Sequence, residues 1–201
     1  MISLIKSILG GIFVSIGGVV YLSTSSTFIG AMLFTIGLFV ILNWNLNLFT
    51  GKICYLFDNK NYKECTITLL GNLIGTFIVA LLVRLTRLDV IDKAVSICQV
   101  KLNDNVLSLF VLAIFCNILI YLAVEGFKTF KGFSKFLALF FGIVVFIMCG
   151  FEHCVADMFY FNLTLNFSFE VLLRLFIIIL GNIIGGIGIR LLVNWSRKDE
   201  I

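Results

Sequence analysis

The sequence predicts an all-α membrane protein whose six transmembrane helices form two inverted three-helix repeats. The first observation is composition: 61% of the 201 residues are hydrophobic and 13% are charged, whereas soluble domains carry about a quarter charged residues. The second is a series of six long apolar runs. The third is that the middle run of each half contains a polar interruption.

The six runs are long enough to cross a bilayer, which takes roughly 20 residues per helix. The first contains Lys6 and resembles a signal peptide when taken alone, but the runs that follow favour a retained helix. No long polar linker separates them, so residues 1–201 are expected to form a single membrane domain. The predicted helices cover residues 4–22, 28–57, 65–85, 106–126, 133–161 and 169–193.

Helices 2 and 5 are expected to be broken. The second run is interrupted by Asn43–Asn47, followed by Thr50 and Gly51, and the fifth by Cys149–His153. Irregular backbone at membrane depth is tolerated only where it faces protein or a cavity, because lipid cannot satisfy its polar groups. Both segments are therefore predicted to line a cavity.

A short motif recurs in the third and sixth runs. Gly71-Asn72-Leu73-Ile74-Gly75 is echoed by Gly181-Asn182-Ile183-Ile184-Gly185. Three spans per half place the halves in opposite orientations, and paired broken helices then mark a substrate path near the midplane. The alternative is that Gly-x-x-x-Gly serves only helix packing.

The basic residues indicate orientation rather than nucleic-acid binding, although the net charge is +4, because most of them flank apolar runs. Cytoplasmic segments of membrane proteins carry the excess of Lys and Arg. The larger group therefore predicts cytoplasmic termini in the inner (plasma) membrane. That group contains Lys6, Lys52, Lys60, Lys63, Lys128, Lys131, Lys135, Arg190, Arg197 and Lys198, and the other side contains Arg84, Arg87, Lys93, Lys101 and Arg174.

His153 is the single histidine and follows Glu152 in the fifth run. A zinc site needs three or four ligands, and the six cysteines form no C-x-x-C pair, so we predict no metal and no cofactor. An ionisable group inside a membrane is costly unless it faces a cavity or a partner. His153 is thus predicted to face a pore, with a hydrogen-bonded packing residue as the alternative. Glu152 is predicted to brace helix ends or pair with a basic group, with contact to a substrate as the alternative.

Several apolar side chains lie beside the two interruptions. Phe34 and Leu38 are one turn apart on helix 2, Phe49 follows its break, and Phe146 lies two turns before His153. Apolar rings at such positions form constrictions that stop hydrated ions. The alternative is that these residues contact only lipid or core.

Four motifs resemble those of the formate/nitrite transporter family. Gly150-Phe151-Glu152-His153-Cys154-Val155-Ala156-Asp157-Met158-Phe159 is similar to its G-F-E-H-S-x-A-N-M-F signature, and Leu48-Phe49-Thr50-Gly51 to its second-helix loop. Cys116-Asn117 with Leu122-Ala123-Val124 resembles its fourth-helix motif, and Gly181–Gly186 its sixth. The motifs occur in the family's order along nearly the whole chain.

The resemblance implies an aquaporin-like fold and a homopentamer in which each protomer holds its own pore. It implies one constriction from Phe34, Leu38, Leu48 and Phe49 and another from Phe146, with Thr50 beside the loop and His153 between them. It also assigns Lys101 and Asn117 as the vestibule lysine and its asparagine. Asp157 stands where the family usually has Asn, and Cys154 where it has Ser.

The function expected from this resemblance is a passive, pH-dependent channel for small monovalent anions that cross with a proton as the weak acid. Formate or nitrite is the expected substrate, with hydrosulfide close behind. The reference pKa of histidine, about 6.5, would suit proton exchange with a weak acid. An aquaporin-like pore for neutral solutes is the alternative, but the chain has no Pro and hence no N-P-A motif. An enzyme using Glu152 and His153 as acid and base lacks a nucleophile on another segment, so no enzymatic activity is expected.

Overall fold

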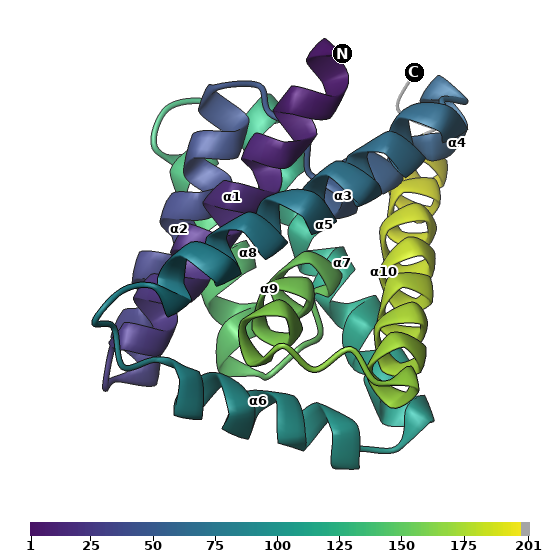
Figure 1. The fold of residues 1–201 in the computed structure, drawn as a ribbon. Helices are drawn as coiled ribbons and strands as arrows, with labels where there is room; N and C mark the ends of the chain where they lie inside the picture. The colour runs from purple at the N-terminus through teal and green to yellow at the C-terminus, as the bar shows by residue number, and fades with distance from the viewer. Residues whose placement is uncertain (198–201) are drawn as a thin grey trace.

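The uninterrupted apolar runs form four long helices in the computed structural model, which describes residues 1–197. Within these residues, α1, α5, α7 and α10 are long and apolar enough to cross a membrane. Lys198, counted above among the basic residues, lies outside the described part. The helices are α1 (Ile2–Ser23), α2 (Thr27–Asn43), α3 (Phe49–Ile53), α4 (Leu56–Asn59), α5 (Tyr62–Arg84), α6 (Ile91–Asn103), α7 (Val106–Thr129), α8 (Ser134–Met148), α9 (Cys154–Thr164) and α10 (Phe169–Ser196) (Figure 1).

Both predicted breaks are confirmed. Helix α2 ends at Asn43 and helix α3 begins at Phe49, while α8 ends at Met148 and α9 begins at Cys154. Each break contains one left-handed residue, Asn45 with φ 51° and Gly150 with φ 66°. Asn and Gly reach this region at least cost, so the residue types make the breaks possible without proline.

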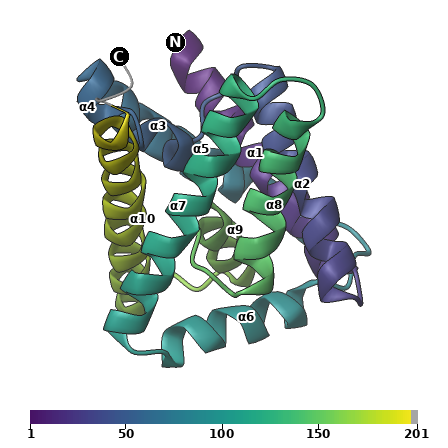
Figure 2. The ribbon, with the colours of Figure 1, turned by 180° about the vertical axis from the view of Figure 1, so that it is seen from behind.

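The helix contacts of the first half repeat in the second. Helix α1 packs against α2 and α5, and α7 packs against α8 and α10 in the same way. Each short helix also packs against a long helix of the other half: α9 packs against α5, and α3 packs against α10. Figures 1 and 2 show the short helix α9 inside a ring of long ones.

The repeated glycines bring the long helices together. A Cβ on Gly75 would overlap the carbonyl oxygen of Ile8 on α1, and a Cβ on Gly185 would overlap that of Ile114 on α7. Small residues at such positions permit close backbone approach in membrane helices. The packing interpretation of the motif is therefore correct for its glycines.

Helix α6 was not predicted. It lies between the predicted helices 65–85 and 106–126 and crosses the end of the molecule opposite both termini (Figures 1 and 2). Its buried residues, Ala94, Cys98 and Lys101, recur at helical spacing. The helix packs on α9 and brings Lys101 into contact with Asp157.

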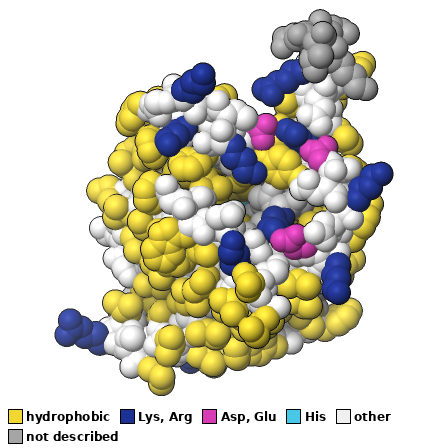
Figure 3. Space-filling model, turned by 90° about the horizontal axis from the view of Figure 1, so that it is seen from above, with side chains coloured by type: hydrophobic (Ala, Val, Ile, Leu, Met, Phe, Trp, Pro, Cys, Tyr) yellow, Lys and Arg dark blue, Asp and Glu magenta, His cyan; other side chains and the backbone are white. Residues whose placement is uncertain are grey.

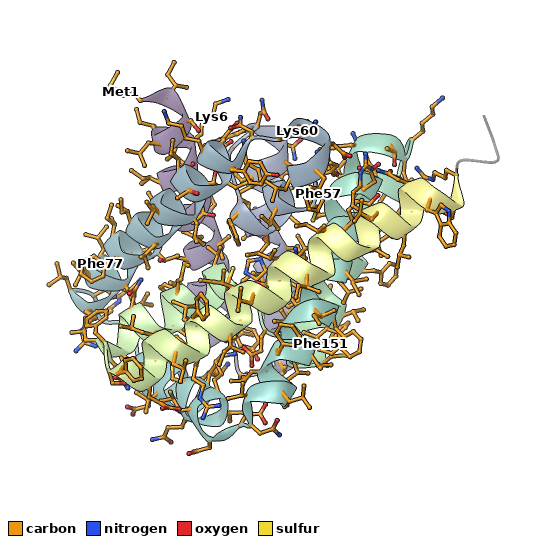
Figure 4. All side chains as sticks on the ribbon, turned by 90° about the vertical axis from the view of Figure 1, so that its right-hand side faces the viewer. Met1, Lys6, Phe57, Lys60, Phe77 and Phe151 are labelled. Atoms are coloured by element: carbon orange, nitrogen blue, oxygen red, sulfur yellow. The ribbon has the colours of Figure 1, made fainter. Side chains whose placement is uncertain are left out.

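The termini lie at the same end of the molecule (Figure 1). Figure 4 shows Lys6 and Lys60 near this end and Phe151 toward the other. Lys and Arg side chains surround a hollow on the end that carries the termini (Figure 3). The outer faces of the long helices expose large apolar side chains such as Phe77, Phe169 and Phe176, as expected for surfaces that meet lipid.

Candidate functional site

Two cavities have linings that come close to each other on helix α2. The Lys52 cavity, of about 610 Å³, is lined by Leu38, Leu48, Gly51, Lys52, Tyr55, Glu64 and Lys128 among others. The Lys101 cavity, of about 210 Å³, is lined by Tyr21, Phe34, Lys101, Phe146, Glu152, His153, Asp157 and Tyr160 among others. Phe34 lines the Lys101 cavity and Leu38 lines the Lys52 cavity, although the two residues are one turn apart on α2.

Aromatic rings close the Lys101 cavity on the side that faces the Lys52 cavity. The Phe34 and Phe146 ring centroids are 6.2 Å apart, edge to face. The His153 ring stacks on Phe146 at 5.6 Å. These contacts correct the grouping expected from the resemblance: Phe34 belongs with Phe146, whereas Leu38 and Leu48 lie at the other cavity.

His153 connects the two short helices. Its Nδ1 accepts a hydrogen bond from the backbone N–H of Ala156 at 3.1 Å, and so caps the N-terminus of α9. With Nδ1 acting as acceptor, a neutral ring carries its proton on Nε2. Nε2 then donates to the hydroxyl of Thr50 on α3 at 3.0 Å. His153 and Thr50 are buried, and the hydroxyl proton of Thr50 remains free to donate.

Two equivalent asparagines hold the short helices in place. Asn182 Oδ1 accepts from the Cys154 N–H at 2.9 Å, and its Nδ2 donates to the carbonyls of Ala113 and Glu152, each at 2.8 Å. The sequence indicated that Asn182 belongs to a repeated motif, but we did not predict these hydrogen bonds from it. They could have been predicted from the presence of an asparagine at the same position in both repeats.

Asn72 makes the corresponding set of bonds in the first half. Its Oδ1 accepts from the Phe49 N–H at 2.9 Å, and its Nδ2 donates to the carbonyls of Ser7 at 2.6 Å and Asn47 at 2.9 Å. Each asparagine thus satisfies the first N–H of a short helix and a carbonyl of the preceding break. The asparagines therefore pair part of the polar backbone of both breaks with protein.

Lys101 is bound by two carboxylates. Its Nζ lies 2.9 Å from Asp157 Oδ1 and also forms an ion pair with Glu152. Burial alone would lower the pKa of Lys101, but the charges of Asp157 and Glu152 outweigh it and raise this pKa. The ammonium therefore stays charged, and the expectation that Glu152 pairs with a basic group is confirmed.

Asn117 does not accompany Lys101. Its Nδ2 donates to the carbonyls of Thr50 at 3.2 Å and Asn182 at 2.8 Å, so it ties the two halves together in the core. Phe49 is also buried and lines neither cavity. The observed hydrogen bonds of Asn117 lie in the core, and the vestibule role of Asn117 and the constriction role of Phe49 stay predictions.

Asp157 contacts Lys101 rather than His153 among the described residues. In the Lys52 cavity, Lys52 pairs with Glu64, and Lys128 lies 4.2 Å from the centre of the Tyr55 ring. Within residues 1–197, no group of three His, Cys, Asp or Glu side chains is placed to hold a metal ion.

A protein-family model described as formate/nitrite transporter matches residues 1–196. The chain belongs to the formate/nitrite transporter family. It is therefore a multi-pass membrane transport protein and not an enzyme, as the four sequence motifs predicted.

Curated relatives of this family member include proteins with two different named substrates. The chain is 28% identical over 215 residues to the formate channel BtFdhC of Bacillus thuringiensis, covering 92% of this chain and 82% of that protein. It is 32% identical over 146 residues to the nitrite transporter NirC of Salmonella typhimurium, covering 65% of this chain and 54% of that protein.

The fold of this formate/nitrite transporter family member matches a solved structure described as a pentameric formate channel with formate bound. The two share a TM-score of 0.82 and 25% identity, over 96% of this chain and 95% of the other. The all-α channel fold is thereby confirmed.

Proposed function

We propose that the chain forms a homopentamer in the inner membrane, with both termini cytoplasmic, and that each protomer passes formate or nitrite passively together with a proton. Hydrosulfide is a third substrate of the same chemistry. The relatives named above support formate and nitrite, and the pentameric formate channel supports the assembly.

The observation that carries the proposal is the apolar barrier between the two cavities. Phe34, Phe146, Leu38 and Leu48 stand where the cavities approach each other. Moving a bare anion into such surroundings costs far more than moving its neutral acid. A weak acid that takes up a proton in one cavity and releases it in the other avoids that cost.

His153 and Thr50 offer the polar contact that a neutral acid needs at the barrier. The Nδ1 atom of His153 is occupied by the cap of α9, so the ring can gain a second proton only by breaking that hydrogen bond. We therefore assign His153 a neutral state in which it orients Thr50, whose hydroxyl proton donates to the passing molecule.

The architecture proposed is six membrane crossings in two inverted repeats, as in aquaporins. The repeated helix contacts and the equivalent bonds of Asn72 and Asn182 support this symmetry. The basic end that carries both termini supports a cytoplasmic placement (Figure 3). The Lys101 cavity then opens on the opposite side of the membrane.

A liposome flux series with purified protein tests the proposal. Formate, nitrite and hydrosulfide should cross faster than in empty liposomes, chloride should not, and influx should rise as the external pH falls from about 8 to about 5, since protonation supplies the neutral acid. Lactate measures the size limit. Absence of flux for all three weak acids across this range contradicts the proposal, and glycerol-driven swelling in its place would favour the neutral-solute pore.

A further inference from the structure

The Lys101 cavity contains more negative than positive charge if all its groups ionise. Lys101 supplies one ammonium, and Glu152 and Asp157 supply two carboxylates that bind it. The three side chains are buried, with exposed fractions of 9%, 5% and 2% for Lys101, Glu152 and Asp157. The cluster is therefore a small buried site with an unbalanced charge.

One oxygen of the cluster has no partner. Asp157 Oδ1 binds the ammonium, but the buried Oδ2 makes no hydrogen bond within the described residues. An ionised carboxylate needs partners for both oxygens when it is removed from water. A protonated carboxyl group can instead turn its O–H toward a neighbouring acceptor.

No second cation faces the cluster among the described residues. The other titratable side chains around it are Tyr21 on α1, Cys98 on α6, Cys116 on α7, and Cys154 and Tyr160 on α9. None of these is positively charged in any protonation state. His153 directs Nε2 to Thr50 and Nδ1 to Ala156, so it does not neutralise the second carboxylate.

Two carboxyl groups that share one site do not both ionise readily, because each charge opposes the other. A single retained proton gives Lys101, Glu152 and Asp157 a net charge of zero. The family's usual Asn at position 157 would leave one carboxylate for one ammonium and no such proton. The second carboxyl group of the cluster is thus present because this chain has Asp at position 157.

We propose that Glu152 and Asp157 hold one proton between them and donate it to the anion that enters the Lys101 cavity. In this step the O–H bond of the carboxyl pair breaks and an O–H bond forms on the substrate oxygen. The negative charge passes from the substrate to the pair, where the Lys101 ammonium stabilises it. The neutral acid then faces Phe34 and Phe146, and water at the cavity mouth returns a proton to the pair.

This inference rests on the proposed function for its substrate, but the proton itself is detectable without transport. Infrared spectra of the reconstituted protein at neutral pH should contain the C=O band of a buried carboxylic acid. Asp157→Asn should remove that band, and Glu152→Gln should also remove it, because either change leaves one carboxylate for one ammonium. Asp89→Asn, which removes an exposed acid before α6, is the matched control and should keep the band.

Flux measurements supply the second readout. Asp157→Asn should lower formate flux at neutral pH on the order of tenfold, and the loss should shrink as the pH falls, because the solution then supplies the neutral acid. Absence of the band from the unmodified protein, or its persistence in both Asp157→Asn and Glu152→Gln, would overturn the inference. A band that behaves as expected in a protein without weak-acid flux would contradict the proposed function and leave the proton assignment standing.

Discussion

Replacing Asn182 with leucine should destabilise the protein and displace His153. The substitution keeps roughly the size of the side chain but removes all three of its buried hydrogen bonds. The carbonyl of Ala113 lies inside α7 and keeps its helical partner. The N–H of Cys154 and the carbonyl of Glu152 lose the partner that Asn182 supplies.

The expected cost follows from these two groups. A buried backbone group left unsatisfied costs about 1–3 kcal/mol, although side-chain hydrogen bonds between membrane helices average only about 0.6 kcal/mol. Asn182 is fully buried, so water is not at hand to replace it. We expect a loss of about 2–4 kcal/mol in the free energy of unfolding, and a similar loss for Asn72→Leu, which removes the equivalent bonds.

The assay is SDS-induced unfolding in mixed micelles, followed by circular dichroism, together with formate flux in liposomes. Asn43→Leu is the matched control, because Asn43 is exposed and, among the described residues, donates only to the Phe39 carbonyl of its own helix. Its cost should stay below about 1 kcal/mol. If Asn182→Leu costs no more than Asn43→Leu, the asparagine does not hold α9 as described.

Three further substitutions test the barrier and the packing. Thr50→Val should lower formate flux while the circular dichroism spectrum stays unchanged, since it removes the hydroxyl that accepts from His153; flux equal to the unmodified protein would exclude the hydroxyl from the path. Phe146→Ala should raise lactate flux relative to formate, because it removes the ring that meets Phe34 and His153, and an unchanged ratio would place the size limit elsewhere. Gly75→Val should lower the melting temperature, because its Cβ would overlap the Ile8 carbonyl. Gly188→Val should change it little, because its Cβ would meet no described residue within 4 Å; equal shifts would contradict the close approach of α5 and α1.

The sequence was sufficient for the long helices and the two breaks, because both depend on local composition. Apolar length predicts a spanning helix, and Asn45 and Gly150 are residue types that permit a left-handed turn. The predicted helix 65–85 begins three residues late, since Tyr62, Lys63 and Glu64 are polar but extend α5 beyond its apolar part.

We did not predict helix α6 because it contains charged residues and buries only a narrow face. The length of an apolar run, which identified the other helices, does not detect such a helix. The grouping of Phe34 failed for another reason. Spacing along α2 shows which face Phe34 shares with Leu38, but not that Phe146 of α8 meets it on one side of the barrier. Lys101 and Asp157 are likewise brought together only by the packing of α6 on α9.

Leu48 and His153 occupy corresponding places, since each is the residue that immediately precedes a short helix. The two halves are therefore alike in backbone and unlike in chemistry at their meeting point: one contributes a hydrocarbon and the other an imidazole. His153 and the neighbouring Thr50 form one polar contact point between the cavities, so we expect a single molecule to occupy it at a time. Turnover would then be set by how quickly that molecule departs rather than by repulsion between successive ones, and flux should saturate with concentration along a simple hyperbola.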